Sequence, residues 1–145
     1  MEIDKLVQRQ RDFYRTGRTK DTAFRIASLQ KLADTIEKYE AEIGEALKAD
    51  LHKSVFEGFM TEVGLTLSEI RFLIKHTAVW NRPKKVRTPL AQFHAKSYIV
   101  QEPYGVALVM SPWNYPFMLS LEEPLPRVTA VLSNPRLMRL RPLPS

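Results

Sequence analysis

A short apolar run that ends in a proline-containing turn constrains the fold of this chain more than any other feature. Residues 106–110 are Val-Ala-Leu-Val-Met, and Ser-Pro-Trp-Asn-Tyr-Pro follows directly at 111–116. An apolar run this short, set between turn residues, is typical of a strand that is buried on both faces of a parallel sheet. Because ligands bind beyond the carboxyl ends of the strands in open α/β sheets, the pattern predicts that Asn114 lies where chemistry takes place.

The composition fits one soluble globular domain and excludes several kinds of site. The chain has 145 residues, of which 44% are hydrophobic and 26% are charged, and these values are ordinary for a globular protein. It contains no cysteine, so disulfides, thiolate metal sites and a cysteine nucleophile are excluded from this sequence. Its charged N-terminus has no signal-peptide core and no apolar stretch reaches membrane-spanning length, so we expect a cytoplasmic location.

The positive charge is concentrated near the C-terminus. The formal net charge is +6, but residues 126–145 have no acidic residue and contain four arginines, Arg127, Arg136, Arg139 and Arg141. This distribution argues against a basic nucleic-acid-binding face on a folded domain. Five of the ten prolines also lie in residues 124–145. We therefore treat residues 126–145 as a divergent tail without regular structure.

Two amphipathic stripes predict long helices that pack on a core. The first has apolar residues at spacings of three and four, and Thr19 or Asp21 can cap its start; its members are Ile26, Leu29, Leu32, Ile36, Tyr39, Ile43 and Leu47. The second opens with a capping box, Ser-Val-Phe-Glu at 54–57, and we expect it to end before Pro83; its members are Phe56, Met60, Val63, Leu67, Ile70 and Ile74.

The segments around these helices have weaker signals. Residues 1–18 are expected to form a helical or loosely ordered arm that breaks at Gly17. Residues 82–96 are expected to be a basic connector, and residues 97–102 favour a strand. Residues 117–125 are expected to begin a further helix.

The Pro112-Trp113-Asn114 turn resembles a motif of the aldehyde dehydrogenase superfamily. Four further segments, at 17–20, 50–54, 61–64 and 88–93, are similar to its class 3-like branch, and the resemblance extends over about residues 5–125. It implies an α/β fold that corresponds to the N-terminal part of the aldehyde dehydrogenase fold. In that fold, amphipathic helices cover a Rossmann-like cofactor domain, residues 97–102 are an oligomerisation strand, and residues 106–110 are an early strand of the cofactor domain.

The resemblance also implies a reaction, the oxidation of fatty or aromatic aldehydes to carboxylic acids with NAD or NADP. Asn114 matches the family asparagine whose side-chain amide donates to the aldehyde oxygen, where a preformed neutral donor stabilises developing negative charge. The neighbouring residues are assigned by the same match: Ser111, Pro112 and Trp113 to the nicotinamide side of the cleft, and Tyr115 and Phe117 to the aldehyde entrance.

The family also uses a cysteine nucleophile and a glutamate base that lie further along a full-length sequence. We therefore expect this chain alone to be inactive, and we assign cofactor binding, aldehyde binding and homodimer formation to a longer parent enzyme. The abrupt change of composition after about residue 125 suggests that the tail is an out-of-frame translation of a truncated sequence. Without neighbouring strands, residues 106–110 are expected to form an exposed apolar patch.

Two other functions remain open. The first is a non-catalytic interaction protein that pairs with a full-length subunit through the strand at 97–102, because an unpaired strand edge favours such pairing. The second is a nucleic-acid binder that uses the arginines of the tail, which we rank last because the tail has no aromatic residues. Metal binding is not expected, because His52, His76 and His94 have no second ligand at helical spacing.

Overall fold

Helices make up most of the molecule. The computed structural model describes residues 3–103 and 105–122. Its α-helices are α1 (Ile3–Arg15), α2 (Thr22–Lys38), α3 (Glu40–Leu51), α4 (Val55–Gly58), α5 (Gly64–Trp80) and α6 (Pro116–Glu122). Short turns of other helical types occur at η1 (Arg18–Lys20), η2 (Phe59–Val63) and η3 (Leu90–Gln92), and two strands form β1 (Lys84–Val86) and β2 (Ser97–Ile99). None of the described helices combines the length and apolar character that crossing a membrane requires.

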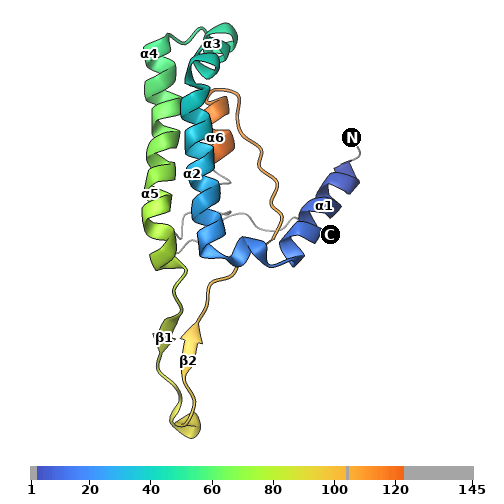
Figure 1. Ribbon diagram of the computed structural model, residues 1–145, viewed down its shortest axis with the longest axis vertical. Helices are drawn as coiled ribbons and strands as arrows, with labels where there is room; N and C mark the ends of the chain where they lie inside the picture. The colour runs from blue at the N-terminus through green and yellow to red at the C-terminus, as the bar shows by residue number, and fades with distance from the viewer. Residues whose placement is uncertain (1–2, 104, 123–145) are drawn as a thin grey trace.

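The core lies between α2 and α5, which run side by side (Figure 1). Both predicted stripes contribute buried side chains to it, namely Leu29, Ile36, Val63, Leu67 and Ile70, and Ala33 and Leu73, which belong to neither stripe, are buried beside them. Each large aliphatic side chain that leaves water in this way stabilises the fold by about 1.5–3 kcal/mol. The core therefore confirms that the two stripes are faces of packed helices.

Local signals at the helix ends are confirmed. Gly17 follows α1 with a φ of 75°, a left-handed conformation that glycine adopts without steric cost. Of the two candidate caps, Asp21 caps α2: its carboxylate accepts a hydrogen bond from the Ala23 amide at 3.1 Å. The Ser54 hydroxyl accepts from the Glu57 amide at 3.1 Å, as in a capping box. Helix α5 ends at Trp80, before Pro83.

The first predicted helix is broken at Tyr39, which corrects the single stripe expected from Ile26 to Leu47. Tyr39 has φ −104° and ψ 15°, outside the helical region, and its side chain is exposed rather than buried. The break lets α3 turn away from α2 and pack against α4, at the end of the molecule opposite the strands (Figure 1). In this orientation Leu47 becomes buried, so tertiary packing overrides the continuous helical pattern.

The start of the second predicted stripe is also wrong. Phe56 and Met60 are 75% and 52% exposed, whereas Val63, Leu67 and Ile70 are buried and Ile74 is partly buried. The cause is the π-helical turn η2, in which hydrogen bonds close one residue further along the chain than in an α-helix. This extra residue shifts the helical register, so Phe56 and Met60 are rotated away from the face on which Val63 is buried.

The basic connector contains a strand that the sequence did not predict. Within the described residues, the sheet consists of β1 and β2, paired antiparallel with Lys84 opposite Ile99 and Val86 opposite Ser97. The predicted strand at 97–102 is thus present but shorter. The hairpin extends away from the helices (Figure 1).

The predicted strand at 106–110 is absent. This segment is extended but has no strand pairing, and Leu108 and Met110 are 78% and 84% exposed. A strand forms through hydrogen bonds to at least one neighbouring strand, and the described part of the chain supplies none for this segment. The expected exposed apolar patch is therefore confirmed. The helix expected at 117–125 is present as α6, whereas its last residues and the tail at 126–145 lie outside the described residues.

Candidate functional site

The Asn114 turn leads directly into α6, which seats it on the helical core. Asn114 is exposed, and Pro116 is the first residue of α6. Proline suits this position because its fixed φ is helical and its missing N–H would have no partner there. Phe117 and Leu121 of α6 are half-buried and pack against the core between α2 and α5. The turn is thus attached to the buried core of the described residues.

A buried ion pair lies beneath this turn. The Lys53 Nζ donates to Glu62 Oε1 at 2.5 Å, and the two residues are only 8% and 0% exposed. Burying a charge is costly unless it is paired and its other hydrogen-bonding positions are filled. The other contacts of the two side chains therefore determine the structural role of the ion pair.

The second oxygen of Glu62 binds the beginning of α6. Its Oε2 accepts from the backbone amides of Phe117 at 2.8 Å and Met118 at 3.3 Å. The first amides of a helix have no partner within the helix, and a negative charge near them is favourable. Glu62 therefore acts as an N-terminal cap for α6 that is supplied by another part of the chain.

Lys53 binds the other side of the turn. Its Nζ donates to the backbone carbonyl of Asn114 at 3.2 Å and lies 4.2 Å from the centre of the Tyr115 ring. A cation over an aromatic face at this distance is attracted by the π-electrons. Together, Lys53 and Glu62 hold the backbone of residues 114–118 at both ends; we call this pair the clamp.

Two local irregularities bring the members of the clamp together. His52 ends α3 in a left-handed conformation, with φ 56°, so the chain reverses before Lys53 and α4 starts after Ser54. Glu62 lies in the π-helical turn η2, next to the buried Val63. Irregular turns of this type often occur at functional sites.

The other predicted site residues surround the turn. The Ser111 hydroxyl lies 2.7 Å from that of Ser120 on α6. Pro112 and Trp113 are exposed, Trp113 to 80%. Tyr115 and Phe117 are half-buried and belong to the clamped segment. The structure therefore brings Asn114, Tyr115 and Phe117 together through the clamp, while the assigned contacts to cofactor and aldehyde stay predictions.

Sequence reasoning missed Lys53 and Glu62 as members of the site. Both lie in segments that carried the family resemblance, at 50–54 and 61–64, but no role was assigned to them. One signal was available: Glu62 lies four residues before Thr66 and eight before Ile70, which places a carboxylate on the buried side of a helical stripe. The partner of that carboxylate could not be identified from spacing alone.

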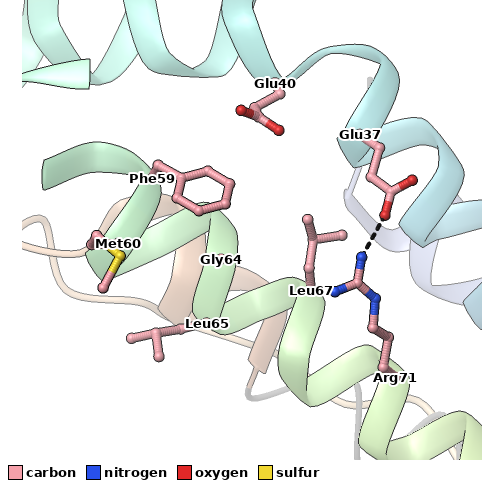
Figure 2. Close-up of a pocket in the computed structure, with 8 residues that line it drawn as sticks. All are labelled: Glu37, Glu40, Phe59, Met60, Gly64, Leu65, Leu67 and Arg71. Carbon is pink, nitrogen blue, oxygen red and sulfur yellow. Dashed lines mark hydrogen bonds and ion pairs between the residues drawn. The ribbon is translucent and has the colours of Figure 1, made fainter. Parts of the chain in front are cut away.

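A separate pocket of about 580 Å³ opens between α2, α3, η2 and α5 (Figure 2). Most of its lining is apolar, and an ion pair of 2.8 Å between Arg71 and Glu37 lies at one side. The pocket shares no residue with the Asn114 turn. Within residues 3–103 and 105–122, no group of three or more acidic, histidine or cysteine side chains is arranged to hold a metal ion.

Comparison with known proteins identifies the family. The model of the aldehyde dehydrogenase family matches residues 1–131. This chain belongs to the aldehyde dehydrogenase family. As an aldehyde dehydrogenase family member it is 44% identical over 118 residues to 4,4'-diaponeurosporen-aldehyde dehydrogenase of Staphylococcus aureus, a match that covers 81% of this chain and 26% of that protein.

Other relatives confirm the resemblance to the class 3 branch. The chain is 40% identical over 125 residues to aldehyde dehydrogenase family 3 member I1, chloroplastic, of Arabidopsis thaliana, covering 86% of this chain and 23% of that protein. Its structure superposes on a substrate-bound Staphylococcus aureus AldH with a TM-score of 0.82 and 41% identity, over 89% of this chain and 28% of the other. The chain thus spans about a quarter of the length of these aldehyde dehydrogenases.

Proposed function

We propose that this chain provides the aldehyde-oxygen side of the active site of an NAD(P)-dependent aldehyde dehydrogenase, with Asn114 as the hydrogen-bond donor. The observation that carries this proposal is an exposed asparagine in a turn whose backbone is held by the buried pair Lys53 and Glu62. A donor that is already in position stabilises developing negative charge without reorganising. Membership of the aldehyde dehydrogenase family supports the choice of reaction.

The role of Asn114 follows from the charge that develops during aldehyde oxidation. When a thiolate attacks the carbonyl carbon, the carbon–oxygen double bond opens and its electron pair moves onto the oxygen. A side-chain amide N–H of Asn114 would donate to that oxygen and lower the barrier. In the family the thiolate comes from a cysteine, which this sequence lacks, so the nucleophile must belong to sequence that this chain does not contain.

The residues before Asn114 fit the nicotinamide end of the cofactor. Trp113 presents an exposed aromatic side chain and Ser111 an exposed hydroxyl, groups that can stack on a planar ring and bond to a carboxamide. When bound, the cofactor supplies a hydride acceptor. Tyr115 and Phe117 are proposed to lie at the aldehyde entrance.

We also propose that the β1–β2 hairpin is a subunit contact of the longer enzyme. It extends beyond the helices (Figure 1), and Leu90, Phe93, Tyr98 and Ile99 are all exposed on it or on its connecting turn. An unpaired strand edge with apolar side chains favours pairing with another chain. The same observation supports the alternative function, in which this chain pairs with a full-length subunit without catalysis.

The test of the proposed function needs the missing catalytic groups. Residues 1–122 would replace the matching segment of the Staphylococcus aureus relative, and aldehyde oxidation by this chimera would be followed through NAD(P)H absorbance. We expect Asn114→Ala to lower kcat by roughly 100- to 1,000-fold. Asn114→Asp should lower kcat by a similar factor, because a carboxylate is similar in size to the amide but cannot donate a hydrogen bond.

Asn81→Ala is the matched control. The Asn81 side chain donates to the Thr22 hydroxyl at 2.6 Å, so its loss should lower thermal stability and leave kcat within about twofold. A chimera in which Asn114→Ala retains kcat within about twofold would refute the role of Asn114.

A further inference from the structure

Stabilisation of the core does not by itself explain why the clamp is a buried ion pair. Its ion pair is nearly completely buried, and such pairs contribute little net stability because desolvation opposes their attraction. Apolar side chains of similar volume often replace them without loss of stability. The role of a buried ion pair is therefore better explained by the groups that it holds in place. For Lys53 and Glu62, these groups are the other hydrogen-bond partners of the two side chains.

Within the part of the chain that the structure describes, the contacts of the clamp beyond its own ion pair go to one short segment. Glu62 accepts from the amides of Phe117 and Met118, while Lys53 donates to the Asn114 carbonyl and lies over the Tyr115 ring. These contacts lie on both sides of the turn. They fix the backbone at residue 114 and at residues 117–118, so little freedom remains between them.

We propose that Lys53 and Glu62 are positioning residues that set the location of the Asn114 amide for the aldehyde oxygen. This inference rests on the proposed function of Asn114. A donor to an oxyanion must lie about 2.7–3.1 Å from it, and a displacement of about 1 Å in an active site can cost about 100-fold in rate. An exposed turn without supporting contacts would not meet that tolerance.

Charged groups suit this task better than neutral ones. Hydrogen bonds that involve an ionised group are shorter and roughly twice as strong as neutral ones. The compact ammonium of Lys53 has three donors, enough to reach Glu62 and the Asn114 carbonyl while facing the Tyr115 ring. The planar fork of arginine cannot point in these directions from the same place.

The first test measures the clamp in the 145-residue chain itself. In Lys53→Met and Glu62→Gln we expect the amides of Phe117 and Met118 to exchange with deuterium at least about tenfold faster, while the amide of Ile70 in the core keeps its protection. The double variant Lys53→Met/Glu62→Gln leaves no unpaired buried charge. The exchange measurement is therefore made on the double variant if a single variant unfolds. Unchanged protection of Phe117 and Met118 in a folded variant would refute the clamp.

Arg71→Met is the matched control for this measurement. Arg71 and Glu37 also form an ion pair between two helices, at 2.8 Å, but both side chains are exposed and remote from the turn in sequence. Like Lys53→Met, the substitution replaces a cationic side chain with methionine. Exchange at Phe117 and Met118 should not change in this variant, and equal acceleration would show that the effect is not specific to the clamp.

The second test asks whether Lys53 acts through Asn114, and it uses the chimera described above. Lys53→Met should lower kcat by about 10- to 100-fold with less than about a threefold change in KM. Added to Asn114→Ala, the same substitution should cost less than about twofold more, because the amide it positions is gone. Losses that multiply would overturn the positioning role.

The two tests separate failure of this inference from failure of the proposed function. If Asn114→Ala lowers kcat and Lys53→Met does not, the clamp has no catalytic purpose and only the inference fails. If Asn114→Ala itself leaves kcat unchanged, the proposed function fails and the inference falls with it, whatever the exchange experiment shows.

Discussion

At the scale of single residues, buried charges are placed where they can be satisfied. Arg25 is 3% exposed on α2, and its Nε donates to the backbone carbonyl of Thr19. Burial lowers the pKa of its guanidinium from the usual value, while the nearby negative charge of Asp21 opposes the shift. Asp21 thus has two functions, because it caps α2 and also faces a buried cation.

The first prediction concerns Asp21. Replacing Asp21 with alanine removes the acceptor of the Ala23 amide and one of the charges that favour ionised Arg25. We expect the free energy of unfolding to fall by about 1–2 kcal/mol, measured from urea denaturation followed by circular dichroism.

Asp50→Ala provides the control for that measurement. Asp50 lies exposed in the last turn of α3, where a negative charge is mildly unfavourable. Its removal should change the free energy of unfolding by no more than about 0.5 kcal/mol. Equal effects of the two substitutions would mean that capping and the contact with Arg25 contribute nothing.

At the scale of elements, the π-helical turn η2 decides which side chains are buried. It exposes Phe56 and Met60 and places Glu62 inside. Gly64 closes this turn, since its amide donates to the Phe59 carbonyl. A Cβ at Gly64 would lie 3.0 Å from that same oxygen, tighter than nearly all real Cβ contacts.

The second prediction is a comparison of two glycines in helices. Gly64→Ala should lower the free energy of unfolding by about 1 kcal/mol, because the backbone of η2 must shift. Gly44→Ala on α3 meets no atom within 4 Å, so it should raise the free energy of unfolding by about 0.5–1 kcal/mol. Thermal unfolding of both variants measures the difference, and stabilisation by both would show that η2 tolerates the added methyl group.

At the scale of the whole molecule, the described residues leave an apolar segment uncovered. Residues 106–110 extend between the hairpin and the Asn114 turn, with Leu108 and Met110 largely exposed. Uncovered apolar surface of this kind marks an interaction site or favours aggregation. In relatives about three times as long, further chain is available to cover it.

The third prediction follows from this exposure. The double substitution Leu108→Lys/Met110→Lys should reduce self-association of the 145-residue chain, because it places charge on the uncovered segment. Light scattering as a function of protein concentration measures the effect. Val79→Lys adds charge at a single exposed apolar position on α5 and should have a much smaller effect; an equal effect would mean that net charge alone controls solubility.

The fourth prediction concerns activity of the chain alone. Because the sequence contains no cysteine, the purified 145-residue chain should form no NAD(P)H from an aldehyde and NAD or NADP. The chimera with the Staphylococcus aureus relative is the positive control. Turnover by the purified chain alone would contradict the requirement for a nucleophile outside it.

Helix ends and buried stripes are determined by the sequence itself, because they depend on neighbours within one turn. A cap at Thr19 or Asp21, the break at Gly17 and the end of α5 before Pro83 were all predicted from such local signals, and the structure selects Asp21 as the cap. The family resemblance, now confirmed, also identified the turn that carries Asn114. These features need only short-range geometry or a matching motif.

Only the tertiary structure determined the break between α2 and α3 at Tyr39, the register shift at η2 and the partners of the Asn114 turn. Lys53 lies 61 residues from Asn114, and Glu62 lies 55 from Phe117. No spacing rule relates residues so far apart, because their contact depends on how α3, η2 and α6 pack together. The unpaired state of residues 106–110 has a similar cause: a run suited to a buried strand becomes one only where neighbouring strands supply its hydrogen bonds.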